Sequence, residues 1–412
     1  MSLIEDYAAV AGEEIIERLR QLAREFEGRT VVHVNSTRTG GGVAEILAKL
    51  VPLSRELGID ARWEVIAGEG AFYECTKAMH NALQGSPVDI PPRLWQAYEN
   101  TNAANADALR ERLEEADFVI IHDPQPALLL RHCPNRKGKW IWRCHIDVSR
   151  PHRPVWRYMR PVVSAYDASV FSLAAFAHDL GHPAYVVPPS IDPLGAKNGE
   201  LPDDELVAVR ERFGLDPERR LIAQISRFDR FKDPVGVIQA YRLTRRFAPG
   251  LQLVLAGGGA ADDPEGAAVL EDVRAAAGDD ADIHVLELPP NDDRTVNALQ
   301  RLADIVLQKS TREGFGLTVT EAMWKGRPVI GGDTGGIRLQ IFDHRTGFRV
   351  STPEGAALRL RYLFHHRELA ATMGVTAREY VRNRFLITRQ LREYLTLQLA
   401  LLHDARERIE IG

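Results

Sequence analysis

The chain alternates short apolar runs with longer stretches in which apolar residues recur at helical spacing. Short apolar runs bounded by turn residues are typical of buried parallel strands, and the helical stretches between them are typical of crossover helices. A long polar helical stretch is predicted over about 71–113. In the first half of the chain, strands are predicted at 30–35, 61–66, 118–123, 140–146 and 168–172.

The second half repeats this organisation after a segment at 186–205 that is rich in Pro, Gly and acidic residues and that we interpret as a linker. Its strands are predicted at 221–226, 251–257, 283–288, 304–309 and 328–332. The pattern indicates an α/β fold class with two doubly wound, Rossmann-like domains facing across a cleft. We expect domains at 1–187 and 188–375, followed by C-terminal helices at 376–412 that pack back across both.

Composition excludes several classes of protein. The 412 residues suit two domains, and the net charge of −5 argues against a nucleic-acid partner. The three cysteines have no CxxC spacing, so they indicate neither a metal site nor a disulfide framework. The N-terminus reads as an acidic amphipathic helix, and no apolar stretch reaches the roughly 20 residues that span a bilayer. We therefore expect a cytoplasmic protein without a membrane partner.

A glycine run follows the first predicted strand. Thr39, Gly40, Gly41 and Gly42 open a helix, and glycines at such a turn let backbone N–H groups approach a phosphate or a sugar. The run is not GxGxxG, and no acidic residue stands about 20 positions further on at a strand end, so a dinucleotide site is not predicted. Gly41 and Gly42 are candidates for donor binding, with a plain strand-to-helix turn as the open alternative.

Two cations follow the strand at 221–226. Arg227 and Lys232 share one strand-to-helix loop, where they could clamp a diphosphate and stabilise it as a leaving group. Isolated basic loop residues are usually solvated surface charges. The position of this pair at the carboxyl edge of a sheet, where ligands of such folds bind, favours the functional interpretation.

The strongest pattern is a pair of carboxylates that follows the strand at 304–309. Glu313 and Glu321 flank a Gly-rich turn that leads into a helix, so one carboxylate stands in the loop and the other within the helix. Helix-dipole placement of acids explains Glu321 poorly, because it stands too far into the helix. N–H groups at a helix start can bind phosphate oxygens. The candidate donor-binding residues between the two carboxylates are Gly314, Phe315, Gly316, Leu317 and Thr318.

Polar residues also end the strands of the first half. They form a group suited to binding the hydroxyls of an acceptor, although a strand-end histidine is more often structural than catalytic. Clustering at neighbouring strand ends favours function. The residues are His122, Asp123, Gln125, His145 and Asp147, with Asn35 and Ser36 at the end of the first strand.

The literal DxD at Asp280 and Asp282 resembles a metal-held diphosphate site. It precedes the strand at 283–288 instead of following one, in an acidic loop away from the carboxyl edge. We therefore predict no metal site.

Together these motifs resemble the retaining GT-B glycosyltransferases of the sucrose-synthase and glycogen-synthase-like class. The carrying residues are the carboxylate pair Glu313 and Glu321, the cations Arg227 and Lys232, and the glycine run at 40–42. Longer strings resemble the trehalose glycosyltransferring synthases over nearly the whole chain. These strings are VHVNSTRTGGGVAEIL (32–47), MHNALQG (79–85), HDPQPA (122–127), WRCHIDVS (142–149), PPSIDPL (188–194) and REGFGLTVTEAMWKG (312–326).

The resemblance implies an activity and roles for the residues. A nucleotide-diphosphoglucose (ADP-, UDP- or GDP-glucose) would be the co-substrate, with no prosthetic group, and glucose from it would join free glucose reversibly to give α,α-trehalose with retention. The N-terminal domain would bind the acceptor and the C-terminal domain the nucleotide sugar. Arg227 and Lys232 would neutralise the diphosphate, Glu313 would hold the transferred sugar, Glu321 the ribose, and His145 would position the donor sugar.

The chain departs from the class pattern at two places. The run Gly335 to Leu339 lacks the glutamate of the GGxxE motif that many members carry, and Asp233 stands where glycine is frequent. The preferred nucleotide base therefore stays open. The rival interpretations are a sucrose- or glucan-forming transferase, a phosphorylase or epimerase on the same architecture, and a sugar-nucleotide sensor without turnover. A homodimer is a further expectation for which the sequence offers no interface stripe.

Overall fold

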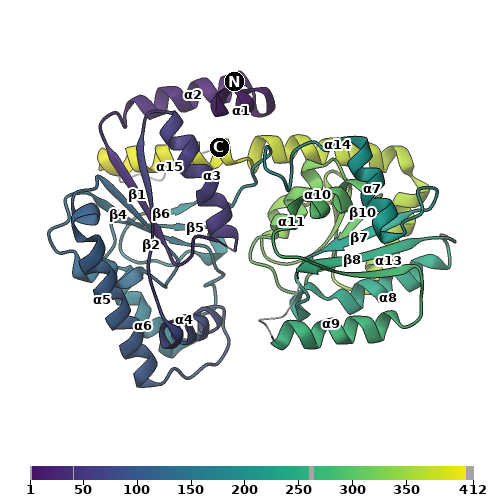
Figure 1. Cartoon of the computed structure of the whole chain (residues 1–412), viewed down its shortest axis with the longest axis horizontal. Coiled ribbons are helices and arrows are strands. Elements are labelled where there is room, and N and C mark those ends of the chain that lie inside the picture. The colour runs from purple at the N-terminus through teal and green to yellow at the C-terminus, as the bar shows by residue number, and fades with distance from the viewer. Residues whose placement is uncertain (1, 40, 259–263, 405–412) are drawn as a thin grey trace. The chain divides into compact units, whose positions relative to one another are not determined.

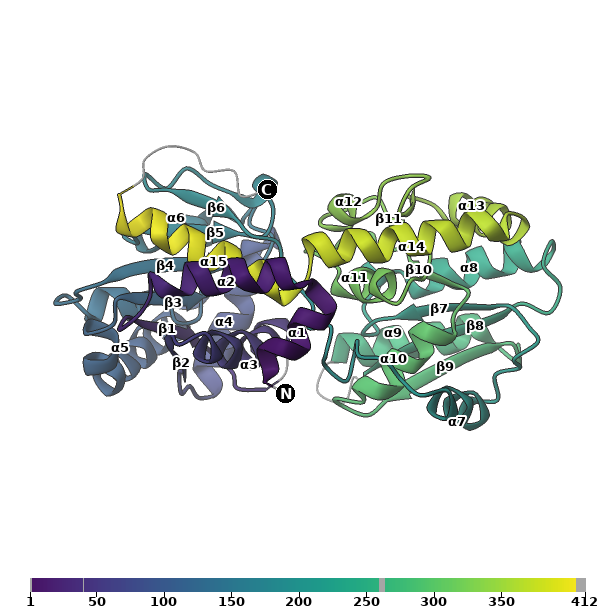
Figure 2. The ribbon, with the colours of Figure 1, turned by 90° about the horizontal axis from the view of Figure 1, so that it is seen from above.

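The computed structural model describes residues 2–39, 41–258 and 264–404, so Gly40 of the glycine run lies outside the described residues. The chain divides into two compact units. The first comprises Met1–Ser190 together with Ile387–Gly412, and the second comprises Ile191–Leu386. Each unit is a six-stranded parallel sheet with helices on both faces (Figure 1, Figure 2).

The sheet of the first unit has the strand order β2-β1-β3-β4-β5-β6, and every neighbouring pair is parallel. The chain adds β2 on one side of β1 and then crosses to add β3 on the other side. This reversal is a topological switch point, where loops diverge and ligands of doubly wound folds bind. The strands are β1 (Thr30–Asn35), β2 (Asp60–Val65), β3 (Phe118–His122), β4 (Lys139–Cys144), β5 (Ala168–Phe171) and β6 (Ala184–Val186).

Helices cover both faces of this sheet, as parallel strands require. The first three helices and the last helix of the chain pack together on one face, and α4, α5 and α6 cover the other (Figure 1). The helices are α1 (Leu3–Ala11), α2 (Glu13–Arg24), α3 (Gly42–Glu56), α4 (Gly70–Leu83), α5 (Pro92–Glu114), α6 (Arg153–Val163) and α15 (Ile387–Leu402), with short 3-10 turns at Ala127–His132 and Ala174–Phe176.

The second unit repeats the design with the strand order β12-β11-β10-β7-β8-β9. Here β8 and β9 are added on one side of β7 and β10 on the other, so the switch point lies between β7 and β10. The strands are β7 (Leu221–Ile225), β8 (Gln252–Gly258), β9 (Ile283–Leu288), β10 (Ile305–Gln308), β11 (Val329–Gly332) and β12 (Gly347–Val350).

The helices of the second unit likewise form two layers, with α8, α9 and α13 on one face and α7, α10, α11 and α14 on the other (Figure 1, Figure 2). They are α7 (Asp203–Phe213), α8 (Pro234–Arg245), α9 (Pro264–Ala277), α10 (Asp293–Leu302), α11 (Leu317–Trp324), α12 (Ile337–Gln340), α13 (Pro353–His365) and α14 (Arg367–Arg384), with a 3-10 turn at Arg230–Lys232.

The ten predicted strands are all present, displaced by about two residues at most. The predictions missed β6 and β12, each of which is one of the two edge strands of its sheet. Both are short: β6 has only three residues, none of them buried, and in β12 Gly347 and Arg349 interrupt the apolar run that marks a buried strand. The helical stretch predicted over 71–113 is two helices, α4 and α5, separated by a loop that contains Gly85 and Pro91.

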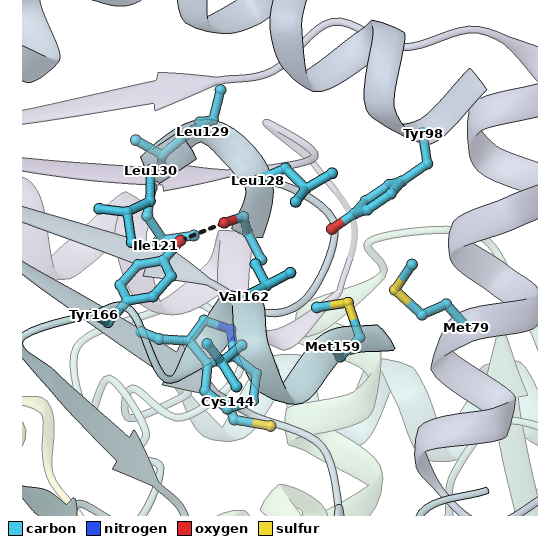
Figure 3. Packing of buried hydrophobic residues seen from close by; sticks show 14 of the residues in the cluster. Met79, Tyr98, Ile121, Leu128, Leu129, Leu130, Cys144, Met159, Val162 and Tyr166 are labelled. Carbon is cyan, nitrogen blue, oxygen red and sulfur yellow. Dashed lines mark hydrogen bonds between the residues drawn. The ribbon is translucent and has the colours of Figure 1, made fainter. Parts of the chain in front are cut away.

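The core of the first unit lies between the sheet and α4, α5 and α6. Met79 of α4 and Met159 of α6 point toward one another, and the Tyr166 hydroxyl donates to the carbonyl of Ala127 over 2.7 Å (Figure 3). Tyr98 of α5 is fully buried, and its hydroxyl donates to the carbonyl of Pro124 in the loop after β3. The core therefore fixes the strand-end loop that carries Asp123 and Gln125.

Helix α15 closes the other face of this sheet with a polar layer. Arg389 donates to Glu393 one turn further along over 2.5 Å and to the carbonyls of Pro188 and Pro189, and burial lowers its pKa below the usual value of arginine. The Ser190 hydroxyl donates to the Gln390 side chain. Within the expected C-terminal segment 376–412, the end of α14 thus belongs to the second unit, and α15 belongs to the first.

Candidate active site

The loop after β7 is held in a tight shape by its own side chains. The Asp229 carboxylate accepts a hydrogen bond from the Phe231 N–H over 2.7 Å and so caps the 3-10 turn Arg230–Lys232. Gln224 at the end of β7 donates from its amide to the Lys232 carbonyl over 2.7 Å. This bracing fixes the backbone of Lys232 at the carboxyl end of the sheet.

The Lys232 side chain meets Glu313 across the switch point. Its Nζ lies 2.5 Å from Glu313 Oε2, and the Ser310 hydroxyl donates to the same oxygen over 3.2 Å. The two ionic side chains are only 17% and 9% exposed. They meet because β7 and β10 are neighbours in the sheet, so the loops that follow them leave the same edge. The structure thus brings together two residues that the sequence placed in separate motifs.

Asp233 explains one departure from the class pattern. Its φ is +52°, a left-handed conformation in which glycine is the usual residue and aspartate is tolerated. Its carboxylate caps α8 by accepting from the Gly236 N–H, and it pairs with Lys309, whose side chain is 4% exposed. Lys309 was not predicted from the sequence, because nothing local distinguishes it from other strand-end residues.

The loop that carries Glu313 packs against Gly335 and Gly336, the two glycines of the run that lacks the GGxxE glutamate. Gly335 has a φ of +46°, and a Cβ at this position would overlap the Glu313 carbonyl. The Gly336 N–H donates to the Gly314 carbonyl over 3.0 Å, and the Gln340 amide donates to the Phe315 carbonyl over 2.7 Å. The two glycines are thus needed because the backbone of their segment lies directly against the backbone of the Glu313 loop. This requirement does not depend on the glutamate of the GGxxE motif.

Helix α11 begins directly after this loop. Gly316 is its N-cap with a φ of +86°, and the N–H groups of Leu317 and Thr318 belong to the first turn, which has no intrahelical acceptors. Glu321 lies in the second turn and is 5% exposed. Along the chain, the loop carboxylate Glu313, the N–H groups of the first helical turn and the helical carboxylate Glu321 follow one another in the expected order, and their binding roles stay predictions.

A buried lysine that the predictions missed stands one turn beyond Glu321. The Lys325 ammonium donates to Asn198 Oδ1, Gln300 Oε1 and the Glu321 carbonyl over 3.0, 2.7 and 3.3 Å. Burial lowers the pKa of Lys325 to about 7. These bonds tie the end of α11 to α10 and to the segment before α7, which fixes the direction of the helix.

Arg227, the other predicted cation, lies apart from this cluster. Its side chain is 76% exposed, and its guanidinium lies 3.8 Å from the Asp229 carboxylate. Such exposure leaves Arg227 available to a ligand, but it is not joined to Lys232 or Glu313 by a bond. The DxD carboxylates are engaged elsewhere, since Asp280 pairs with Arg245 over 2.7 Å and Asp282 with Arg219 over 2.6 Å.

In the first unit, Asn35 supports the loop that follows β1. Its amide donates to the Thr37 carbonyl over 2.8 Å and accepts from the Trp63 indole over 2.8 Å, while the Arg38 guanidinium lies over the Trp63 ring. Ser36 is half-buried, and Gly41 and Gly42 are exposed, Gly41 with a φ of +81° and Gly42 at the start of α3. The Asn35 side chain therefore shapes this loop.

Asp123 holds the backbone of His145. Its carboxylate accepts from the His145 N–H over 2.7 Å, and its carbonyl accepts from the Trp142 indole over 3.1 Å. Burial raises the pKa of Asp123 to about 6. Its φ of +64° is unusual for a residue other than glycine and accompanies the sharp turn after β3.

The remaining strand-end residues differ in how much of their hydrogen-bonding capacity is used. The half-buried Gln125 has a side-chain oxygen, Oε1, that finds no partner in the described part of the chain, although the Gln125 carbonyl accepts from Asn102 of α5. Asp147, also half-buried, accepts from the Ser149 N–H over 2.9 Å in a local turn. Gln125 therefore has a buried side-chain acceptor that no described residue uses.

Three histidines form a continuous file in this unit. His33 Nδ1 lies 3.0 Å from His122 Nε2, and His122 Nδ1 lies 2.9 Å from His145 Nε2. His122 and His145 were predicted as site residues, whereas His33 was missed. The alternation of β1 places His33 on the same face as His122 of β3, and this signal becomes readable only when the two strands are known to be neighbours.

The MHNALQG string packs against the loop after β4. The His152 N–H donates to the Ala82 carbonyl over 2.8 Å, and Gly85, with a φ of +97°, approaches the Arg150 carbonyl so closely that a Cβ would lie 2.9 Å from it. This string therefore supports the segment that follows His145.

Comparison with known proteins decides the family. The model for "Trehalose synthase, N-terminal domain" matches residues 33–178, and that for "Glycosyl transferases group 1" matches 208–380. The trehalose synthase of Pyrococcus horikoshii is 46% identical over 398 residues, which cover 96% of this chain and 95% of that protein. The chain belongs to the trehalose synthase family of glycosyltransferases. The trehalose synthase of Rubrobacter xylanophilus is 42% identical over 96% of both chains.

Solved structures agree with this family on the fold. An E. coli trehalose-6-phosphate protein bound with UDP-2-fluoro glucose is similar with a TM-score of 0.74 at 14% identity, over 90% of this chain and 98% of that chain. The predicted GT-B glycosyltransferase fold is confirmed, and the trehalose-related glycosyltransferase function follows from the family. Within residues 2–39, 41–258 and 264–404, no group of three or more His, Cys, Asp or Glu side chains is arranged to hold a metal ion, and no helix is long and apolar enough to cross a membrane.

Proposed function

We propose that this trehalose synthase family member transfers glucose from a nucleotide-diphosphoglucose to free glucose, forming α,α-trehalose reversibly and with retention at the anomeric carbon. The observation that carries the proposal is the Lys232–Glu313 pair at the switch point between β7 and β10, beside the N-terminus of α11. A cation for a leaving diphosphate and a carboxylate for sugar hydroxyls then stand within one hydrogen bond of each other.

The chemistry requires charge to be neutralised on the leaving group. The bond between the anomeric carbon and the diphosphate oxygen breaks, and the bond to the acceptor hydroxyl oxygen forms on the same face. The proton of that hydroxyl moves to the departing diphosphate. Lys232 and the exposed Arg227 neutralise the diphosphate, and Glu313 holds hydroxyls of the donor glucose and stabilises its oxocarbenium-like centre.

The start of α11 supplies the rest of the donor site. The N–H groups of Gly316, Leu317 and Thr318 bind phosphate oxygens, as first-turn groups of a helix commonly do. Glu321 accepts from the ribose hydroxyls. Bound diphosphate would compete with Glu313 for Lys232, so donor binding releases the carboxylate toward the sugar.

The strand ends of the first unit supply the acceptor side. Gln125 contributes its unused Oε1, and Asp147 accepts from glucose hydroxyls. His145 positions the transferred sugar, with Asp123 holding its backbone. Asn35 and Ser36 at the end of β1 would contribute to the acceptor side, and the N–H groups of Gly41 and Gly42 would bind the donor.

The experiment that tests the proposal incubates the protein with glucose and ADP-, UDP- or GDP-glucose in the presence of EDTA, and identifies the product by NMR. We expect an α,α-1,1-linked disaccharide and a ranking of the three bases. Donor consumption with a different product would discard glucose as acceptor. A requirement for inorganic phosphate would favour a phosphorylase, and binding without turnover of any donor would favour a sensor.

A further inference from the structure

The histidine file connects the interior of the first sheet to its ligand-binding edge. His33 and His122 are 3% and 2% exposed, whereas His145 is half-buried. The rings lie edge to edge and nearly in one plane, with interplanar angles of 29° and 21° and with centroids 5.3 Å apart for the inner pair and 5.2 Å for the outer pair. Each ring comes from a different segment, namely β1, the end of β3 and the turn after β4, so the file is a product of the sheet order.

The number of protons in the file limits its arrangements. Burial lowers the pKa of His33 to about 3 and that of His122 and His145 well below 6.5, so all three rings are neutral at pH 7. A neutral imidazole carries one N–H, and each of the two contacts uses one proton. The third proton is therefore either on His145 Nδ1, with all donation running outward, or on His33 Nε2, with all donation running inward.

The inner end of the file lies at a small cavity whose lining includes a buried hydrogen-bond donor, and this donor favours the outward arrangement. The cavity, of about 10 Å³, is lined by His33, Tyr394 and Gln398, among others, and it has room for about one water molecule. The Gln398 amide nitrogen is buried without a hydrogen-bond partner in the described residues. An amide nitrogen can only donate, so an accepting His33 Nε2 satisfies it through that water.

The outer end of the file is accessible. His145 Nε2 is engaged with His122, while its Nδ1 has no protein partner within the described ranges. We propose that His33 and His122 are positioning residues that hold His145 as the Nδ1–H tautomer, so that His145 donates a hydrogen bond to a hydroxyl oxygen of the sugar. This inference rests on the proposed function for its ligand. The tautomer itself does not depend on any reaction.

The tautomer is tested directly by 15N NMR of the imidazole rings in the full-length protein without substrate. We expect each ring to be neutral, with the proton on Nδ1 in His33, His122 and His145. A proton on Nε2 of His145, or a mixture of tautomers, would overturn the inference. This measurement gives its answer even if none of the nucleotide sugars proves to be a donor.

The functional role is tested by two substitutions at His33. In His33→Asn the side-chain amide can replace the donating Nδ1–H, so turnover should stay within about threefold of the parent, whereas His33→Leu removes the donor and should lower kcat about 10- to 100-fold, the usual effect of losing an orienting partner. His182→Asn is the matched control, because His182 contacts Ser169 outside the file, and it should leave turnover unchanged.

The two variants also separate positioning from mere structural support. Equal kcat values for folded His33→Asn and His33→Leu would overturn the inference while the parent still forms trehalose. If His33→Leu does not fold, the variant Gln398→Leu removes a donor at the inner end instead, and the NMR spectrum should then show a loss of the single tautomer at His145. An unchanged spectrum of Gln398→Leu would count against the inference. Failure of the parent to form trehalose would count against the proposed function alone.

Discussion

Lys232→Ala is the substitution that most directly tests the donor site. Lys232 Nζ lies 2.5 Å from Glu313 Oε2 with side chains that are 17% and 9% exposed. Breaking a fully buried ion pair costs about 3–5 kcal/mol of unfolding free energy, and breaking an exposed pair costs about 1 kcal/mol or less. The exposure of this pair lies between the two cases, and Ser310 still donates to the carboxylate, so we expect a loss of about 1–3 kcal/mol.

The expected effect on turnover is larger than the effect on stability. Loss of one electrostatic stabiliser of a developing charge lowers kcat about 100- to 1000-fold, or about 2.7–4 kcal/mol. Steady-state kinetics with the preferred nucleotide-diphosphoglucose and urea unfolding should therefore be measured on the same preparation. If Lys232 also contacts the diphosphate, Lys232→Ala combined with Glu313→Gln should be slower than Glu313→Gln alone.

The matched control is Lys197→Ala, which removes a partly buried lysine of the same unit whose ammonium lies 3.5 Å from Asp293. It should keep the kcat of the parent. A Lys232→Ala protein that is folded and retains kcat within about threefold of the parent would refute the assigned role, because no major electrostatic term would then depend on this cation.

Three further changes test the supports of the site. Gly335→Ala should lower both the thermal stability and kcat, because the new Cβ would overlap the Glu313 carbonyl. Gly70→Ala is the control in thermal melts and kinetics, because nothing lies within 4 Å of a Cβ at that position. Equal behaviour of the two variants would contradict the close packing of Gly335 against Glu313. Asp233→Ala should be less stable than Asp233→Gly by about 1–2 kcal/mol in urea unfolding. Both variants lose the helix cap and the ion pair with Lys309, but only alanine is strained at a φ of +52°. A reversed order of stability would contradict the left-handed conformation at this position. Burial depresses the pKa values of His33, His122 and His145, so the free energy of unfolding is highest above pH 6.5 and falls below it, by up to about 1.4 kcal/mol per pH unit for each ring. Urea unfolding at pH 7, 6 and 5 should show a shallower fall for His33→Asn than for the parent, because the variant loses one titrating ring and keeps the neighbouring charged groups Asp123 and Arg143. An unchanged slope would count against a buried neutral His33.

Much of the local structure could be predicted from the sequence because buried strands and helices need apolar residues at characteristic spacings. A strand covered on both faces needs a continuous apolar run, and so β1, β3, β7 and β10 were located closely. The short edge strand β12 could not be located, because Gly347 and Arg349 interrupt its apolar residues although the strand is mostly buried. The spacing of Glu313 and Glu321 across a glycine turn likewise predicted a loop carboxylate and a helical one, since helix starts have local sequence rules.

The ion-pair partners of the candidate residues could not be predicted from local sequence. Lys232 and Glu313 are far apart in the chain, and nothing in either segment names the other; they meet because β10 adds next to β7 instead of next to β9. The pairing of Asp233 with Lys309 depends on the same neighbours. Both contacts therefore required the strand order.

The sequence by itself determined the α/β class, the position of ten strands and the polar residues that end them, because these depend on local burial, turn chemistry and capping. Only the tertiary structure decided which strand ends are adjacent, and with them the ion pair at Glu313 and the file from His33 through His122 to His145. The physical reason is that strands pair through backbone groups that are the same in every strand, so the choice of neighbour is made by the packing of the whole sheet and its helices and leaves no mark on any single segment.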